Sequence, residues 1–128
     1  MRTIFKRLCC LFILLGANTY GSTLLVLGDS LSAGYGIDPA NGWVNLLQED
    51  LSANYKVVNG SISGDTTGGG LARLPLLLEK FQPDFVILEL GGNDGLRGQP
   101  LKLMKKNLAA MIALCTDANA VPVLFGMR

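Results

Sequence analysis

The chain has 128 residues, which suffices for one domain, and its 11 basic and 10 acidic side chains give a net charge of +1. No basic stripe or acidic tail stands out, so the charge pattern gives no reason to expect a nucleic-acid partner. The sequence contains no histidine, the side chain that most often serves as a base or metal ligand near neutral pH. Any enzymatic interpretation must therefore account for the missing base.

The first residues have the pattern of a secretory signal peptide. An apolar run over residues 8–17 is too short to span a bilayer comfortably, and it follows three basic residues, Arg2, Lys6 and Arg7. Small and polar residues come next, so we predict a signal peptide over residues 1–21, with cleavage after Gly21 or Ser22. A periplasmic or secreted chain without a stable membrane span follows from this interpretation, and an uncleaved anchor is the alternative.

Two of the three cysteines, Cys9 and Cys10, would leave with the signal peptide. Only Cys115 would remain, so we expect no internal disulfide in the mature chain. Cys115 lies in a predicted helix, where we expect it to be a small buried hydrophobic residue.

Short apolar runs alternate with amphipathic segments along the rest of the chain. The apolar runs predict strands at residues 23–27, 55–58, 85–90 and 121–125. The amphipathic segments predict helices at residues 43–53, 71–81 and 101–118, and Pro75 should fall in the first turns of the second helix, where proline is best tolerated.

Strands that alternate with helices predict an α/β domain with a parallel sheet covered on both faces. The chemistry of such sheets lies at the carboxyl ends of the strands, which is where three polar, glycine-rich loops of this chain fall. No helix follows the last predicted strand, so one sheet face or edge should stay uncovered, and we interpret the chain as truncated.

Three residues in these loops could together perform acyl transfer. Ser30 follows the first strand and could present a nucleophilic hydroxyl, while Gly64 and Asn93 could donate hydrogen bonds from a backbone N–H and a side-chain amide. Taken singly, each has an equally simple interpretation as a turn residue. Taken together, they place a nucleophile and oxyanion donors at one edge of the sheet.

Three aspartates at the same strand ends leave a second interpretation open. Asp29, Asp65 and Asp94 could hold a divalent cation, as in a receiver-like or phosphatase-like domain. We favour the interpretation in which these carboxylates accept hydrogen bonds from nearby loop amides, because no metal-binding motif accompanies them. Arg73 is expected to pack or to form an ion pair.

Four segments together resemble one enzyme family. GDSLSAGYG, NGSISGDTT, GLARLP and ELGGNDGLRG are similar, in order and spacing, to the SGNH/GDSL hydrolases, in their thioesterase I/lysophospholipase L1 (arylesterase-like) branch. The resemblance extends over residues 23–128. It implies a flavodoxin-like three-layer α/β/α sandwich with a five-stranded parallel sheet, whose final strand and helix are missing here.

The resemblance also implies roles for individual residues. Ser30 would be the nucleophile, and the Ser30 amide, Gly64 and Asn93 would form the oxyanion hole. Acyl esters or thioesters would be the substrates, no metal or organic cofactor would be needed, and the complete protein would be a monomer.

The sequence departs from the family at its fourth block, D-x-x-H, which supplies the base and its orienting aspartate. That block is missing from this sequence, so Ser30 cannot be activated in the usual way. We therefore expect residues 22–128 to form a partial hydrolase domain with little turnover by itself.

Overall fold

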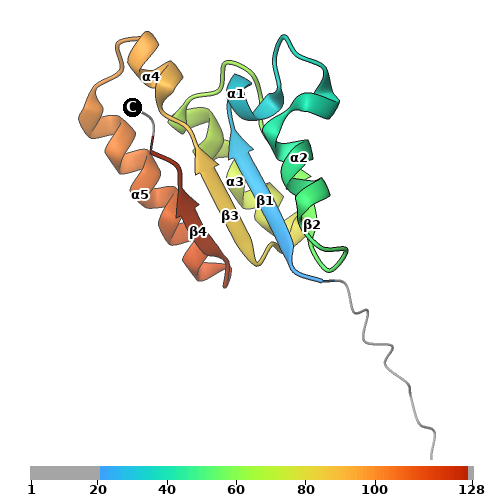
Figure 1. Cartoon of the computed structure of the whole chain (residues 1–128). Coiled ribbons are helices and arrows are strands. Elements are labelled where there is room, and N and C mark those ends of the chain that lie inside the picture. Colours follow the sequence, from blue (N-terminus) through green and yellow to red (C-terminus); the bar gives the residue numbers. More distant parts are fainter. Residues whose placement is uncertain (1–20, 127–128) are drawn as a thin grey trace, which may run out of the picture.

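The computed structural model describes residues 21–126, which fold around one parallel sheet (Figure 1). Its strands lie in the order β2-β1-β3-β4. Their bounds are β1 Thr23–Gly28, β2 Lys56–Asn59, β3 Phe85–Glu89 and β4 Val121–Leu124. All three strand pairs are parallel, which confirms the predicted sheet.

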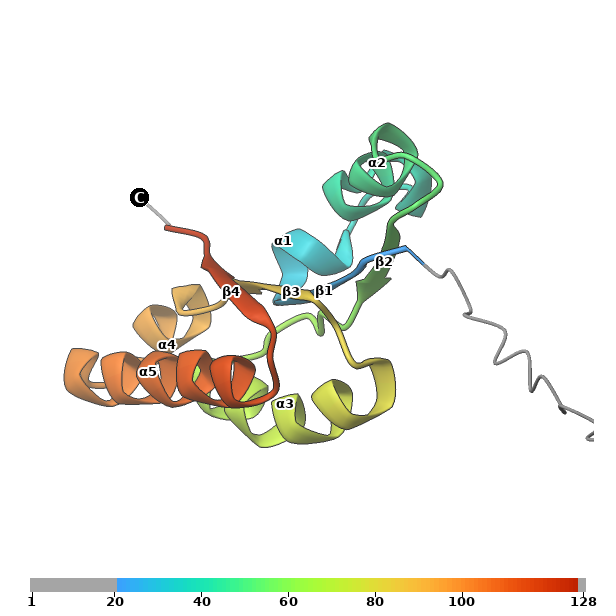
Figure 2. The ribbon, with the colours of Figure 1, turned by 90° about the horizontal axis from the view of Figure 1, so that it is seen from below.

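Helices cover the two faces of the sheet and complete three layers. The helices are α1 Ser30–Ala33, the 3-10 helix η1 Pro39–Asn41, α2 Trp43–Asp50, α3 Thr67–Phe81, α4 Gly92–Leu96 and α5 Leu101–Asp117. Figure 2 shows α1 and α2 on one face of the sheet and α3 and α5 on the other. The predicted α/β/α arrangement is therefore confirmed.

Most of the core lies between the sheet and the α3–α5 layer. Its fully buried large side chains include Leu25, Leu27, Leu74, Leu88 and Met111. Burial of one such side chain stabilises a fold by about 1.5–3 kcal/mol, so this layer holds the sheet in place.

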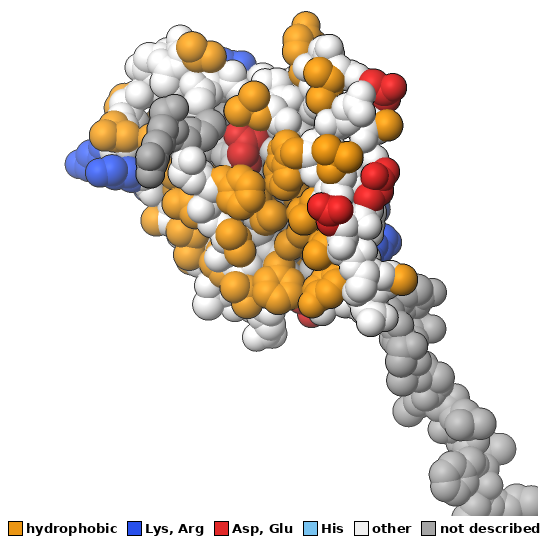
Figure 3. Space-filling model, in the orientation of Figure 1, with side chains coloured by type: hydrophobic (Ala, Val, Ile, Leu, Met, Phe, Trp, Pro, Cys, Tyr) orange, Lys and Arg blue, Asp and Glu red, His pale blue; other side chains and the backbone are white. Residues whose placement is uncertain are grey.

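A smaller cluster of Val26, Val44 and Ile87 joins the other face of the sheet to α2. That second face is covered only in part. Val121 and Val123 of β4 are 53% and 37% exposed, and the ring of Phe125 lies 5.5 Å from that of Trp43. Figure 3 shows hydrophobic side chains gathered on this side of the molecule. Within residues 21–126, β4 thus has an uncovered face, as the sequence predicts.

The start of α3 differs from the prediction. The helix begins at Thr67 rather than at residue 71, so Pro75 lies in the helix interior and not in the first turns. Thr66 caps this earlier start, because its side-chain oxygen accepts a hydrogen bond from the N–H of Gly69. The sequence predicts a loop over these glycines, because glycine has a low intrinsic helix propensity.

Two short helices, α1 and α4, occupy segments that the sequence analysis assigned to loops. The other bounds differ from the predicted ones by a few residues at most; α2, for example, ends at Asp50 rather than at residue 53. None of the helices between residues 21 and 126 is long and apolar enough to cross a membrane. The predicted signal peptide lies outside the described residues except for Gly21.

Candidate active site

Ser30 directly follows β1 and is the first residue of α1, at the carboxyl edge of the sheet. Asp29 caps this short helix, because its Oδ1 accepts a 3.0 Å hydrogen bond from the N–H of Leu31. The turn therefore presents a half-buried serine next to a buried, hydrogen-bonded aspartate.

Glu89, the last residue of β3, lies beneath the Ser30 turn. Its Oε2 accepts a 2.6 Å hydrogen bond from Ser32 Oγ and a longer one, 3.4 Å, from the N–H of Asp29. The side chain is only 4% exposed, and burial raises the pKa of its carboxyl above the ordinary 4.5, with a smaller contribution from the charge of Asp29. The sequence patterns gave no prediction for this residue.

Gly64 lies in the loop after β2 and has a φ of +82°, a conformation that L side chains rarely adopt. Nη2 of Arg97, which follows α4, donates a 2.8 Å hydrogen bond to the carbonyl oxygen of Gly64. This contact holds the loop after β2 against the segment after β3.

Asn93 joins all three loops. Its Nδ2 donates hydrogen bonds to the backbone oxygen of Asp65 at 2.8 Å and to Oδ2 of Asp29 at 3.3 Å. Asp65 follows Gly64 and Asp29 precedes Ser30, so these contacts bring the segments of all three sequence-predicted site residues together at one edge. Both amide hydrogens of Asn93 have protein acceptors in this arrangement, so donation to a substrate oxygen would replace one of these contacts.

Two backbone donors at this edge are not used by the protein. Across residues 21–126, the N–H groups of Ser30 and Gly64 donate no hydrogen bond to a protein acceptor. Unpaired N–H groups suit an oxyanion, because they can donate to it without first breaking a protein contact.

A buried network fixes the helix that carries Asn93. The N–H and hydroxyl of Thr67 both donate to the carboxylate of Asp94, and Nδ2 of Asn107 donates to Thr67 Oγ1 at 3.0 Å. Asp94 and Thr67 are nearly inaccessible to solvent, so α4 is tied to α3 and α5 next to the site.

The alternative cation site is not supported. Asp65 is paired with Arg73, whose Nη2 lies 2.6 Å from Asp65 Oδ2, while Asp29 accepts from Leu31 and Asn93 and Asp94 accepts from Thr67. Among the residues that the structure describes, no group of three His, Cys, Asp or Glu side chains could hold a metal ion. The aspartates instead organise the loops, and Arg73 forms the expected ion pair.

Sequence patterns did not indicate three residues that shape this edge: Thr67, Glu89 and Arg97. Glu89 left one signal, because it is a carboxylate within an otherwise apolar strand run. An ionisable side chain inside a buried strand needs hydrogen-bond partners, so a specific structural role could have been predicted for Glu89.

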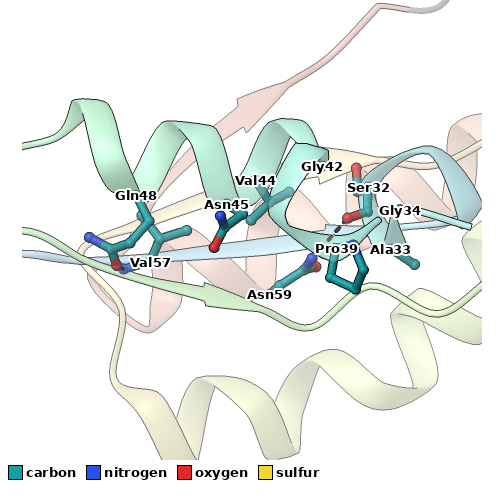
Figure 4. Close-up of a pocket in the computed structure, with 10 residues that line it drawn as sticks. All are labelled: Ser32, Ala33, Gly34, Pro39, Gly42, Val44, Asn45, Gln48, Val57 and Asn59. Atoms are coloured by element: carbon teal, nitrogen blue, oxygen red, sulfur yellow. Dashed lines mark hydrogen bonds between the residues drawn. The ribbon is translucent and has the colours of Figure 1, made fainter. Parts of the chain in front are cut away.

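Two pockets open near these loops. One of about 250 Å³ lies behind α1, between α2 and β2, where the amide of Asn59 donates to the backbone oxygen of Ser32 (Figure 4). The other, of about 290 Å³, adjoins the Gly91–Gly92 turn that leads to Asn93. It is mostly apolar, and its walls are formed by Leu90, Gly91, Gly92, Met104, Leu108, Leu124, Phe125 and Gly126.

Comparisons with known proteins agree with this arrangement. The chain is 47% identical over 131 residues to Esterase TesA of Pseudomonas aeruginosa, an alignment that covers 100% of this chain and 65% of the relative. It is 49% identical over 106 residues to Thioesterase 1/protease 1/lysophospholipase L1 of Escherichia coli K12, covering 83% of this chain and 51% of the relative. The chain therefore spans between about half and two thirds of the length of these relatives.

A crystal structure of TesA superposes with a TM-score of 0.81 at 51% sequence identity, over 84% of this chain and 61% of that one. Residues 26–127 match the GDSL-like Lipase/Acylhydrolase family, and this range includes Ser30, Gly64 and Asn93. With the fold, these matches show that the chain belongs to the GDSL-like lipase/acylhydrolase family, the SGNH/GDSL hydrolases.

Proposed function

We propose that this chain supplies the nucleophile and the oxyanion donors of a serine hydrolase acting on acyl esters or thioesters. The observation that carries the proposal is the convergence of three loops on Asn93, which brings the Ser30 turn and the Gly64 loop to one edge of the sheet. The names of the two relatives above, an esterase and a thioesterase/lysophospholipase, support the same substrate class.

In this mechanism Ser30 Oγ attacks the acyl carbonyl, and the negative charge develops on the carbonyl oxygen. The N–H groups of Ser30 and Gly64 donate to that oxygen. The Asn93 amide also donates to it, and gives up one of its two hydrogen bonds to protein acceptors. Loss of one such donor typically costs about 2.7–4 kcal/mol of transition-state stabilisation. The collapse of the intermediate expels the alcohol or thiol and leaves an acyl-serine, which water then hydrolyses.

The hydroxyl proton of Ser30 needs an acceptor, and the 128 residues contain no histidine that could accept it. Without a base the serine remains a weak nucleophile, because its hydroxyl is protonated at neutral pH. We therefore propose that the isolated chain turns over esters slowly, at a residual rate on the order of 10³-fold above water.

The apolar pocket beside the Gly91–Gly92 turn suits an acyl chain. It adjoins the Gly91–Gly92 turn that leads to Asn93, and its side-chain lining is apolar. Apolar walls close to polar donors favour a substrate with a hydrophobic tail and a single polar reacting group.

The proposal is tested with a chimera of residues 22–126 and the carboxyl-terminal third of Esterase TesA, which this chain matches at 47% identity. The assay is hydrolysis of a short acyl nitrophenyl ester. We expect turnover that Ser30→Ala lowers by about 10⁶-fold, as nucleophile removal does in other serine hydrolases. Circular dichroism and size exclusion establish that both proteins fold.

A folded chimera without turnover, or one whose turnover survives Ser30→Ala, would contradict the proposal. Ser22→Ala serves as a matched serine control, because Ser22 lies before β1, at the other end of that strand from Ser30. We further propose a periplasmic or secreted monomer formed after cleavage near Gly21. Amino-terminal sequencing of protein from the periplasmic fraction, followed by light scattering, tests both statements.

A further inference from the structure

A buried carboxyl group with no role in the proposed reaction lies directly behind the nucleophile turn. Glu89 is paired in register with Gly28, so the last residues of β3 and β1 lie side by side. Side chains alternate along a strand, and Ile87, two residues earlier, packs on the α2 face. Glu89 therefore points to the face on which α1 lies.

A single oxygen of Glu89 contacts both sides of Ser30. Oε2 accepts from the N–H of Asp29, one residue before Ser30, and from the hydroxyl of Ser32, two residues after it. The two donors belong to the cap and the body of α1. These contacts fix the direction in which the first residue of α1 leaves the sheet, and with it the Ser30 amide and hydroxyl.

The backbone of Gly28 also lies close to this oxygen. A Cβ at Gly28 would lie 2.7 Å from Glu89 Oε2 and 2.6 Å from Ser32 Oγ, so only glycine fits at that position. The amide of Asn59 holds α1 from a second side through the backbone oxygen of Ser32 (Figure 4). The Ser30 turn is thus held between β2 and β3.

We propose that Glu89 is a positioning residue for Ser30, acting through Asp29 and Ser32. The inference rests on the proposed function of Ser30. Within residues 21–126 the other oxygen, Oε1, is buried and has no hydrogen-bond partner, which favours the neutral carboxyl. Burial raises the pKa in the same direction. The charged neighbour that acts on Glu89 is Asp29, whereas α1 and β1 present the uncharged Ser32 and Gly28.

NMR of the full chain tests the proposal without substrate. The Glu89 Cδ resonance should titrate above pH 4.5, and the amide signals of Asp29 and Ser30 should move with the same midpoint. Glu89→Gln, which keeps a carbonyl acceptor, should abolish this movement and leave the other signals in place. Glu89→Leu should displace the Ser30 signals, and Glu79→Gln, at an exposed site on α3, should leave the titration intact.

Two results would overturn the positioning role. The Ser30 amide signals could fail to move at the midpoint of the Glu89 Cδ resonance, or their movement at that midpoint could persist in Glu89→Gln. The wild-type titration decides even where Glu89→Leu fails to fold. In the chimera, Glu89→Leu should lower kcat about 10²-fold with KM nearly unchanged, and Glu89→Gln should restore it. An inactive chimera would contradict the proposed function, but it would not affect the shared NMR titration of Glu89 and the Ser30 amide. The two failures are therefore distinguishable.

Discussion

The backbone N–H and the hydroxyl of Thr67 both donate to the carboxylate of Asp94, at 2.8 and 2.5 Å, and both residues are buried. This pair connects the first turn of α3 to α4, the helix that carries Asn93. The local conformation of the candidate oxyanion donor therefore depends on a contact between residues far apart in the sequence.

Asp94→Ala should destabilise the fold by about 2–4 kcal/mol, because it leaves two buried donors of Thr67 without an acceptor. Asp94→Asn, which keeps one acceptor oxygen, should cost less. Urea denaturation measures both, with Asp50→Ala at an exposed site on α2 as the control, expected within about 0.5 kcal/mol of wild type. Equal effects of Asp94→Ala and Asp50→Ala would contradict the prediction.

Gly70→Ala should destabilise the protein by about 1–3 kcal/mol, because the added methyl group enters a packed interior. A Cβ at this position would overlap with Leu90 Cδ1 and would lie 3.5 Å from Met111 Sδ. Gly95→Ala is the matched comparison, since it meets nothing within 4 Å and lies in α4. There we expect a gain of about 0.4–1 kcal/mol. Thermal denaturation measures both, and a stable Gly70→Ala would be inconsistent with the packing described.

Glu89 should make stability depend on pH in a defined direction. Its pKa is raised in the folded protein by burial, so the folded state holds the proton more tightly than the unfolded chain does. The associated stabilisation is complete below pH 4.5 and is lost as the pH rises through the folded-state value.

Glu89→Gln cannot titrate, so its stability relative to wild type should improve over this pH range. Denaturant midpoints at a series of pH values measure the difference, with Glu79→Gln as the control. A flat difference curve for Glu89→Gln would show that the folded-state pKa is not raised.

The thiol of Cys115 should react slowly with disulfide reagents in the folded protein. The side chain is fully buried, so reagents cannot reach it in the native state. Burial also raises the pKa of the thiol to about 11, so little reactive thiolate is present near neutral pH. The measurement uses a Cys9→Ser, Cys10→Ser background, with and without denaturant. Fast labelling of the native protein would mean that the α5 layer opens readily.

Much of the fold was predictable because it depends on local patterns. Apolar runs of strand length between amphipathic segments predicted the strands, the long helices and the parallel sheet, and the positions of Ser30, Gly64 and Asn93 predicted which loops meet at the candidate site. The short helix α1 and the early start of α3 were not predictable in this way. Their glycine and serine residues favour turns unless a cap such as Thr66 or a tertiary contact such as Thr67–Asp94 is present.

The sequence by itself determined the order of the elements and the chemical types at the strand ends, because side-chain periodicity and turn composition are local properties of the chain. Only the tertiary structure decided which of these residues meet. The pairing of Gly28 with Glu89 and the two contacts of Asn93 depend on strand order and register, which are set by long-range packing. For that reason a buried glutamate in an apolar strand became visible as a support for Ser30 only after folding placed it there.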